Sequence, residues 1–566
     1  MCSYAVPAAS DGADEPEVLL DAGAVTRCRR RVHLEHDPNA PAGERLPLDA
    51  GTKQRIADAR AHREEVTARL RDARGGAGWV TVRPGAPPTE RVAATEAALA
   101  ESAEVISGAL LPSDGAGGRR GGSELLVRTG YGYVPIIVVR HKVTDPCSGP
   151  NAARTTPFGE LDPERARPDS ARKLRSQPRD QLRLAHLLEL LRAAGYAETG
   201  RALGGVIGVD ADVIVWHDLT APTFPGGLSA LDEYRRRFAD RLAVATAAAT
   251  GATPLAQPSR VLECRSCPWW SVCERDLLRA RDVSLVVRGD DAVELRKAGV
   301  ATVDDLAALD PNGQEPVLVN NGTNLGHLVA LAQAWCAGHS VVRKVDTVRV
   351  ARADVEVDVD MESYSDRGAY LWGALLSGAD IGVARGYHAF ATWEPLPDED
   401  EARSFAEFWA WFREVRERAA ARGLSFRAYC YNARAENRWL LSSAQRFAGR
   451  RGIPTVDEVD AFVGSEQWVD LFRAVSDSFL CVRGKGLKVI APLAGFSWRD
   501  PDASGEASMQ WYREAVGLDT RMPDRAQRGR LMRYNEDDVR ATAALREWMS
   551  GPAMTRIPHM DSLASE

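Results

Sequence analysis

Three cysteines occur close together near the middle of the chain. Cys264, Cys267 and Cys273 follow a C-x2-C-x5-C spacing, and Cys28 lies in a similarly basic segment, Thr26-Arg27-Cys28-Arg29. Four thiolates brought together can ligate an iron–sulfur cluster or zinc. If Cys28 is the fourth ligand, one centre ties the start of the chain to its middle and closes a domain. The alternative is that these are four unrelated buried thiols.

Carboxylates form a second candidate site. Residues 354–362 read Asp-Val-Glu-Val-Asp-Val-Asp-Met-Glu, a strict alternation of acidic and apolar residues. In a strand such acids project from one face, so Asp360 and Glu362 lie side by side. A carboxylate pair of this kind suits hydrolysis assisted by two divalent cations. The alternative is a solvated strand face, although acids in a row repel one another.

Composition limits the class of protein. The chain has 566 residues, 45% hydrophobic and 27% charged, which is typical of a globular protein with two to four domains. We expect a cytoplasmic protein with no membrane span and no signal peptide, in which thiols are not disulfide-bonded. The net charge of −7 argues against a broad non-specific nucleic-acid surface but permits local basic patches. The sequence has no P-loop.

The first half of the chain predicts mixed helices and strands around the early cysteine. Ranges 124–128 and 133–139 read as paired strands, and 144–169, rich in Pro, Asp and Gly, reads as a loop. The remaining predicted helices are 25–70, 93–108, 180–194 and 231–250, and the remaining strands are 78–82, 206–208 and 213–216.

This layout resembles the RecB-like branch of the PD-(D/E)xK nucleases that carries an iron–sulfur cluster. The resemblance covers about residues 20–280, with Cys28, Cys264, Cys267 and Cys273 in the positions of the family's cysteines. It implies a 4Fe-4S cluster, with zinc as the alternative, that acts as a structural staple.

The same family places a histidine, an acid, an acid-x-Lys pair, a glutamine and a tyrosine around one metal ion. The residues that match are His62, Glu124 and Lys142. Arg140 stands where the second acid is expected, and Arg183 and Leu187 stand at the Gln and Tyr positions, unless Gln181 is the glutamine in a shifted register. We expect a degenerate nuclease domain kept for binding or architecture. The alternative for Arg140 and Lys142 is an ordinary exposed strand edge.

A helical segment and a second α/β pattern follow. Gly299, within 288–310, separates two short amphipathic stretches that resemble half of a helix-hairpin-helix, a phosphate-binding motif; a plain helical linker is the alternative. Lys488 is a candidate phosphate contact or a surface residue. The predicted elements beyond are strands at 354–362, 368–377, 386–393 and 425–431, and helices at 328–337, 401–422 and from 534 onward.

Residues 350–550 resemble the RNase H-like exonucleases of the DEDD type. Asp360 and Glu362 match the first motif, and Tyr534 and Asp538 match the Tyr-x-x-x-Asp motif. Glu436 stands where the second motif ends in Asp. The resemblance implies that these four acids hold Mg2+ or Mn2+, that Glu362 also binds the attacking water and that Tyr534 orients it. Asp470 is a spare candidate for the second acid.

The combined expectation is an α/β chain in three parts: 1–280, a PD-(D/E)xK-like mixed α/β domain with a four-cysteine cluster; 281–345, a helical hairpin linker; and 346–566, an RNase H-like domain. The order resembles a family of bacterial RecB-like nucleases. It implies a metal-dependent exonuclease acting from 3′ ends, with nucleic acid, DNA rather than RNA, as partner. The first alternative is a non-catalytic nucleic-acid-binding or assembly protein with both sites decayed. In the second, the cysteine domain cuts and the C-terminal domain binds.

Overall fold

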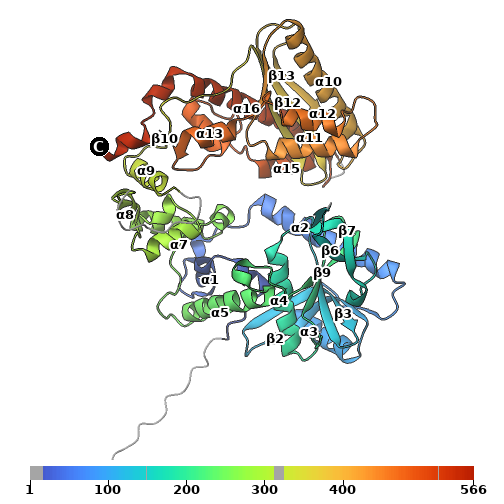
Figure 1. Ribbon diagram of the computed structural model, residues 1–566. Helices are drawn as coiled ribbons and strands as arrows, with labels where there is room; N and C mark the ends of the chain where they lie inside the picture. The colour runs from blue at the N-terminus through green and yellow to red at the C-terminus, as the bar shows by residue number, and fades with distance from the viewer. Residues whose placement is uncertain (1–16, 148, 312–323, 520–521, 566) are drawn as a thin grey trace, which may run out of the picture. The chain divides into compact units, whose positions relative to one another are not determined.

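The chain divides after Asp276 into two compact units. The computed structural model describes residues 17–147, 149–311, 324–519 and 522–565. Both units combine helices with mixed sheets, which confirms the α/β class (Figure 1). The expected helical segment, 281–345, falls within the second unit. Among the described helices, none is long and apolar enough to cross a membrane.

The described part of the first unit contains a nine-stranded mixed sheet in the order β1-β2-β3-β4-β8-β9-β6-β7-β5. Its strands are β1 (Trp79–Thr81), β2 (Val105–Asp114), β3 (Arg119–Thr129), β4 (Gly132–Val138), β5 (Thr144–Pro146), β6 (Ala152–Pro157), β7 (Arg167–Leu174), β8 (Leu203–Ile207) and β9 (Val213–Asp218). Its helices are α1 (Arg29–His36), α2 (Ala50–Ala73), α3 (Pro88–Ala100), α4 (Pro178–Ala193) and α5 (Ala230–Ala249), followed by α6 (Trp270–Ala280) across the boundary.

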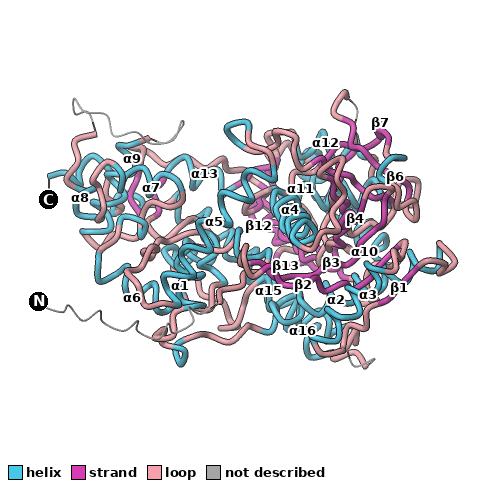
Figure 2. Tube along the Cα trace, turned by 90° about the horizontal axis from the view of Figure 1, so that it is seen from below, coloured by secondary structure: helices cyan, strands magenta, loops and turns pink. Residues whose placement is uncertain are grey.

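Helix α4 covers the middle of this sheet. Its leucines at 184, 187 and 188 are buried with Ile137 and Val206 of the strands beneath, which is the packing that an amphipathic helix requires. The helix contacts β2, β3, β4 and β8, and Figure 2 draws it in cyan beside the magenta strands. Strands β3 and β4 pair antiparallel, as the sequence predicted.

Three predictions for this unit were wrong. The helix expected over 25–70 is two helices, α1 and α2, because the segment between them contains Pro38, Pro41 and Pro47. The helix expected over 93–108 ends at Ala100, and residues from Val105 onward form β2, whose first residues are buried against β1 and β3. The loop expected over 144–169 contains β5, β6 and the start of β7. Strand β7 is largely exposed, so backbone pairing with β5 and β6 rather than an apolar pattern defines it.

The second unit contains, in its described residues, a five-stranded sheet in the order β13-β12-β11-β14-β15. Strand β11 runs antiparallel to β12 and parallel to β14. The strands are β11 (Val355–Tyr364), β12 (Gly368–Gly378), β13 (Gly386–Ala391), β14 (Phe426–Cys430) and β15 (Trp468–Asp470), and β10 (Val341–Arg343) pairs separately with β16 (Phe479–Cys481). The helices are α7 (Asp290–Lys297), α8 (Val303–Ala307), α9 (Leu325–Cys336), α10 (Asp400–Ala421), α11 (Arg434–Arg446), α12 (Val456–Val463), α13 (Leu471–Ser478), α14 (Leu487–Ile490), α15 (Gly505–Val516) and α16 (Arg525–Ser550).

The alternation of β11 separates an apolar face from an acidic one. Val355, Val357, Val359 and Met361 lie in one core with the phenylalanines of α10. Burying each such side chain contributes about 1.5–3 kcal/mol. Helices α15 and α16 contact β11 as well, and Glu356, Asp358 and Glu362 on its acidic face are buried.

Helix α16 begins at Arg525, nine residues before the expected start at Tyr534, because the Asp524 carboxylate caps it by accepting from the Ala526 N–H. A buried ion pair fixes the helix against β11. Arg546, 1% exposed, lies 2.7 Å from Asp358 and 3.2 Å from Glu356. This pairing sets the register between the two elements that carry the acidic site.

Candidate metal centre

Three carboxylates meet on the acidic face of β11. Asp360 and Glu362 come from β11 and Asp538 comes from α16, and their ligand oxygens all lie within 4.8 Å of one another. Among the described residues, no other group of three or more acids, histidines or cysteines is compact enough to hold one metal ion. Carboxylate oxygens are the ligands that Mg2+ and Mn2+ prefer.

The electrostatics of this group favour a bound cation. Burial raises the pKa of Asp360, Glu362 and Asp538, and repulsion from Asp538 raises the pKa values of Asp360 and Glu362 further. Three acids this close must either take up protons or be compensated by positive charge. The residues therefore fit a divalent cation.

Each of the three acids is held by a neutral donor. Asn535 donates Nδ2–H to Asp360 Oδ2 at 2.7 Å, and Trp498 donates Nε1–H to Asp538 Oδ1 at 2.7 Å. The hydroxyl of Ser508 donates to Glu362 Oε2 at 3.1 Å. Donors without charge orient a carboxylate but leave its negative charge available, which is the arrangement of metal ligands and their supporting partners.

A glycine makes room for the donor on Asp360. A Cβ at Gly373, the residue of β12 that pairs with Asp360, would lie 1.6 Å from Asn535 Oδ1. The same Oδ1 accepts from the hydroxyl of Tyr387 at 2.7 Å, which fixes the amide so that its NH2 faces Asp360. Asn535, Gly373 and Tyr387 therefore form one positioning unit.

Tyr534 and Lys488 lie at the edge of the acidic group. Tyr534 hydrogen-bonds to Asp538, one helical turn away, and Lys488 Nζ donates to the Tyr534 hydroxyl at 3.1 Å. Burial raises the pKa of Tyr534, so the phenol keeps its proton. The positive charge of Lys488 lowers the pKa of all three acids.

Glu436 lies beside this group but is not part of the compact set of three. It is 4% exposed on the first turn of α11, and its charge contributes to the raised pKa of Asp360. Burial raises the pKa of Glu436 itself to about 8. Asp470, the spare candidate, accepts from the backbone N–H groups of Asn432 and Phe472 at 3.0 and 2.9 Å, which gives it a capping role.

The four candidate ligand cysteines, Cys28, Cys264, Cys267 and Cys273, lie near one another. Cys28 directly precedes α1, and its backbone N–H donates to Glu263, the residue before Cys264, at 2.6 Å. Burial raises the pKa of Cys267 to about 11 and that of Cys273 to about 12, and the neighbouring thiols raise them further. Cys28 is among the neighbours that act on Cys273.

Arginines contact Glu124 in the expected N-terminal site, whose binding of a metal ion stays a prediction. Glu124 accepts two hydrogen bonds from Arg183, at 2.7 and 2.9 Å. His62 lies on α2, and Lys142 is exposed beyond the end of β4. Arg140 forms an ion pair with Asp58 at 3.2 Å. In the part of the chain that is described, arginines therefore occupy the positions around Glu124 where a cation would bind.

The comparisons with known proteins concern the second unit. Residues 425–550 match a family model described as RNase_H superfamily. The matched segment carries Glu436, Tyr534 and Asp538, and strands β11, β12 and β13, which precede it in the chain, complete the sheet. The second unit thus contains an RNase H-like domain, a fold that suggests a metal-dependent nuclease. No curated protein and no solved structure matches the chain.

Sequence reasoning missed the donors Asn535, Trp498 and Ser508. Asn535 could have been predicted from the sequence, since it precedes Asp538 by three residues and so lies on the same helical face. Trp498 and Ser508 carried none, because they approach the site from segments whose position depends on the whole fold.

Proposed function

We propose that this protein is a metal-dependent nuclease that hydrolyses phosphodiester bonds through the acidic centre of its second unit. The observation that carries the proposal is the meeting of Asp360, Glu362 and Asp538 within 4.8 Å inside an RNase H-like domain. DNA is the proposed substrate class, attacked from its 3′ end as the DEDD resemblance implies.

Asp360, Glu362 and Asp538, with Glu436 beside them, would hold Mg2+ or Mn2+. When bound, the cations supply activation of a water and stabilisation of the leaving oxygen. Asn535, Ser508 and Trp498 keep the carboxylates oriented at 2.7–3.1 Å. Tyr534 keeps its proton at neutral pH and can donate or accept a hydrogen bond at the reacting oxygen.

The test is cleavage of 3′- and 5′-labelled single- and double-stranded DNA and RNA with Mn2+. The double variant Asp360→Asn plus Asp538→Asn should lose cleavage and Mn2+ binding measured by electron paramagnetic resonance. The matched control is Asp477→Asn, whose side chain is 73% exposed. Retained cleavage in the double variant would overturn the assignment. Mn2+ binding without cleavage of any substrate would favour a non-catalytic binding protein.

We also propose that Cys28, Cys264, Cys267 and Cys273 hold a 4Fe-4S cluster that staples the first unit. Its support is the C-x2-C-x5-C spacing together with the proximity of Cys28, Cys264 and Cys267 to Cys273, whose pKa all three raise. Four thiolates suit zinc as well as iron, so the experiment decides the metal. Anaerobic purification tests it. Broad visible absorbance with iron supports the cluster, and a colourless protein with stoichiometric zinc contradicts it.

The first unit, in this proposal, contributes nucleic-acid binding rather than cleavage. Its support is the pairing of Glu124 with Arg183, which engages both oxygens of the carboxylate that the family would use for a metal ion. Lys142→Ala should leave cleavage unchanged. If that substitution abolishes cleavage while Asp360→Asn does not, the cysteine domain is the catalytic one.

A further inference from the structure

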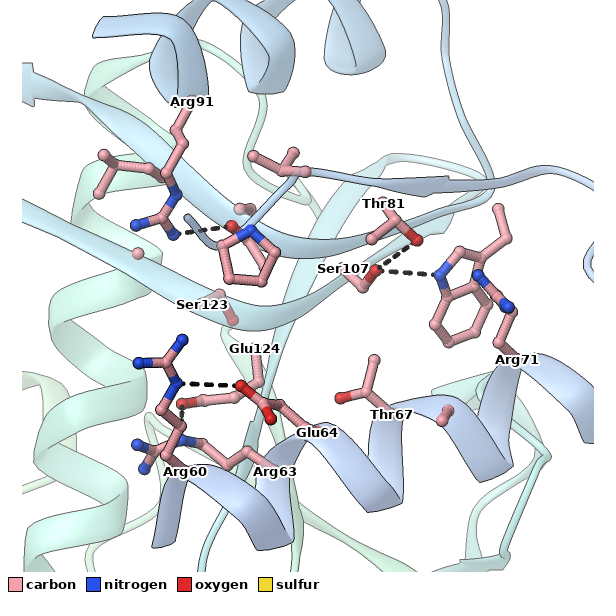
Figure 3. Close-up of a pocket in the computed structure, with 18 residues that line it drawn as sticks. Arg60, Arg63, Glu64, Thr67, Arg71, Thr81, Arg91, Ser107, Ser123 and Glu124 are labelled. Atoms are coloured by element: carbon pink, nitrogen blue, oxygen red, sulfur yellow. Dashed lines mark hydrogen bonds and ion pairs between the residues drawn. The ribbon is translucent and has the colours of Figure 1, made fainter. Parts of the chain in front are cut away.

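A cavity of about 620 Å³ lies within the first unit. Helix α2 forms one wall, and the opposite wall comes from β1, β2, β3 and the start of α3 (Figure 3). Its volume falls in the range of about 300–1,000 Å³ that is typical of small-ligand sites. The cavity belongs to this unit alone and shares no residue with the acidic centre of the second unit.

The charged residues of the cavity are dominated by arginine. Helix α2 presents several of them along one face, and one more comes from α3 on the opposite wall. The charged residues that line the cavity are Arg60, Arg63, Arg71, Arg91, Glu64 and Glu124.

Both acids of the cavity are already neutralised. Glu124 is bound by Arg183 at 2.7 and 2.9 Å and lies 3.7 Å from Arg63. Glu64 accepts from Arg60 at 3.0 Å. A cation therefore finds no unpaired carboxylate here, and the excess positive charge makes the cavity a site for an anion.

Two arginines keep donors for such an anion. Arg71 and Arg91 form no ion pair with a carboxylate in the described parts of the chain. Arg91 donates one terminal N–H to the Gly108 carbonyl at 3.0 Å, while its Nε is buried without a partner. Figure 3 shows Arg91 on α3 and Arg71 on α2, which reach the cavity from its opposite walls. Planar guanidinium groups bind phosphate through paired hydrogen bonds.

The remaining wall is suited to a flat apolar group. The indole N–H of Trp79 donates to Ser107 at 3.0 Å, so its one polar atom is used and the ring offers only its apolar faces. Val82 and Leu110 extend this surface. Arginines together with an aromatic wall match a phosphate joined to a planar base, since bases stack on aromatic rings.

We propose that this cavity binds a nucleotide through its phosphate and base, as a free nucleoside monophosphate or as the phosphorylated end of a strand. The site is separate from cleavage in the second unit. It also explains why arginine surrounds Glu124, since the position that would hold a metal ion in a nuclease here forms the edge of an anion pocket.

The test is calorimetric titration of the full-length protein in chelator, so that no strand is cut. The probes are AMP, adenosine, and a short oligothymidylate with and without a 5′ phosphate. We expect the phosphate-bearing probe to bind at least ten-fold more tightly than its counterpart without phosphate, because charge-assisted hydrogen bonds to arginine are lost. Binding of AMP identifies a free nucleotide as the ligand, and binding of the phosphorylated strand alone identifies a strand end.

Arg71→Gln and Arg91→Gln should each weaken binding about ten-fold or more. The matched control is Arg83→Gln, whose side chain is 78% exposed and does not line the cavity. Arg71 is exposed, so its substitution tests the site even if Arg91→Gln unfolds the protein. The double variant Asp360→Asn plus Asp538→Asn should bind normally, which separates this site from the proposed nuclease centre. Absence of binding by both phosphate probes, or equal binding by Arg71→Gln and wild type, would overturn the proposal.

Discussion

Glu436 offers a direct test of the acidic centre, because its carboxyl group is buried without a full set of partners. It is 4% exposed, and its Oε2 has no hydrogen-bond partner among the described residues. Burial, followed by repulsion from Asp470, raises its pKa from 4.5 to about 8. The substitution Glu436→Gln keeps the shape of the side chain and removes its ability to ionise.

The sign of the effect follows from which state binds the proton more tightly. The folded protein holds the proton of Glu436 up to about pH 8, whereas the unfolded chain releases it near pH 4.5. The stabilising contribution is therefore present below pH 4.5 and is lost as the pH rises toward 8. One pKa unit corresponds to about 1.4 kcal/mol, so between about pH 5 and about pH 9 the wild type loses about 4 kcal/mol from this group.

The assay is urea unfolding of wild type and Glu436→Gln in chelator at both pH values. From the lower to the higher pH, the unfolding free energy of the wild type should fall by about 4 kcal/mol relative to that of Glu436→Gln. An amide left without a partner costs about 1–3 kcal/mol, but at both pH values, so it cancels in this comparison. The matched control is Glu466→Gln, at an exposed position.

At the higher pH, Mn2+ should raise the unfolding free energy of the wild type more than that of Glu436→Gln. Cleavage by Glu436→Gln should be slower by ten-fold or more. A difference in unfolding free energy that does not change with pH would refute the reasoning. It would mean that the Glu436 carboxyl is hydrated in the folded protein.

Three further substitutions test other parts of the structure. Arg546→Met should lower the free energy of unfolding by about 3–5 kcal/mol, because it leaves Asp358 buried and unpaired; a loss below about 1 kcal/mol in urea would contradict this. Gly373→Ala should displace Asn535 from Asp360 and reduce cleavage about ten-fold or more, whereas Gly505→Ala, where a Cβ meets open space, should have no effect on cleavage rate. Cys264→Ser should remove bound metal and lower the melting temperature of the first unit, measured by calorimetry, whereas Cys147→Ser should not; equal melting would argue against a structural staple.

The buried face of β11 in the second unit could be predicted because it follows from the order of neighbouring residues in the sequence. Strict alternation from Asp354 to Glu362 fixes which side chains of β11 share a face, and the structure places the valines in one core and the acids opposite. The spacing of Tyr534 and Asp538 likewise fixes one helical face. The supporting contacts could not be predicted in this way. Asn535 reaches Asp360 because Gly373 of another strand has no side chain, and that depends on three elements meeting.

The first unit was harder to predict because its sheet includes strands without an apolar alternation. Strand β7, residues 167–174, is rich in charged residues and largely exposed, and it is defined by backbone pairing with β5 and β6. The Pro, Asp and Gly content of residues 144–169 therefore indicated a loop that included the start of this strand. The C-x2-C-x5-C spacing is local, whereas the approach of Cys28 to Glu263, 235 residues away, depends on the whole fold of the unit.

Glu124 and Asp360 show why residue type alone cannot assign a site. Each is a carboxylate on a strand of a mixed sheet, and both were candidate metal ligands. Arg183 binds Glu124 with two charged hydrogen bonds, which cancels its charge, whereas the amide of Asn535 holds Asp360 and leaves its charge in place beside Glu362 and Asp538. The partners of a carboxylate thus decide which charge its site attracts. By this criterion the second unit suits a cation, and the cavity beside Glu124 suits a phosphate.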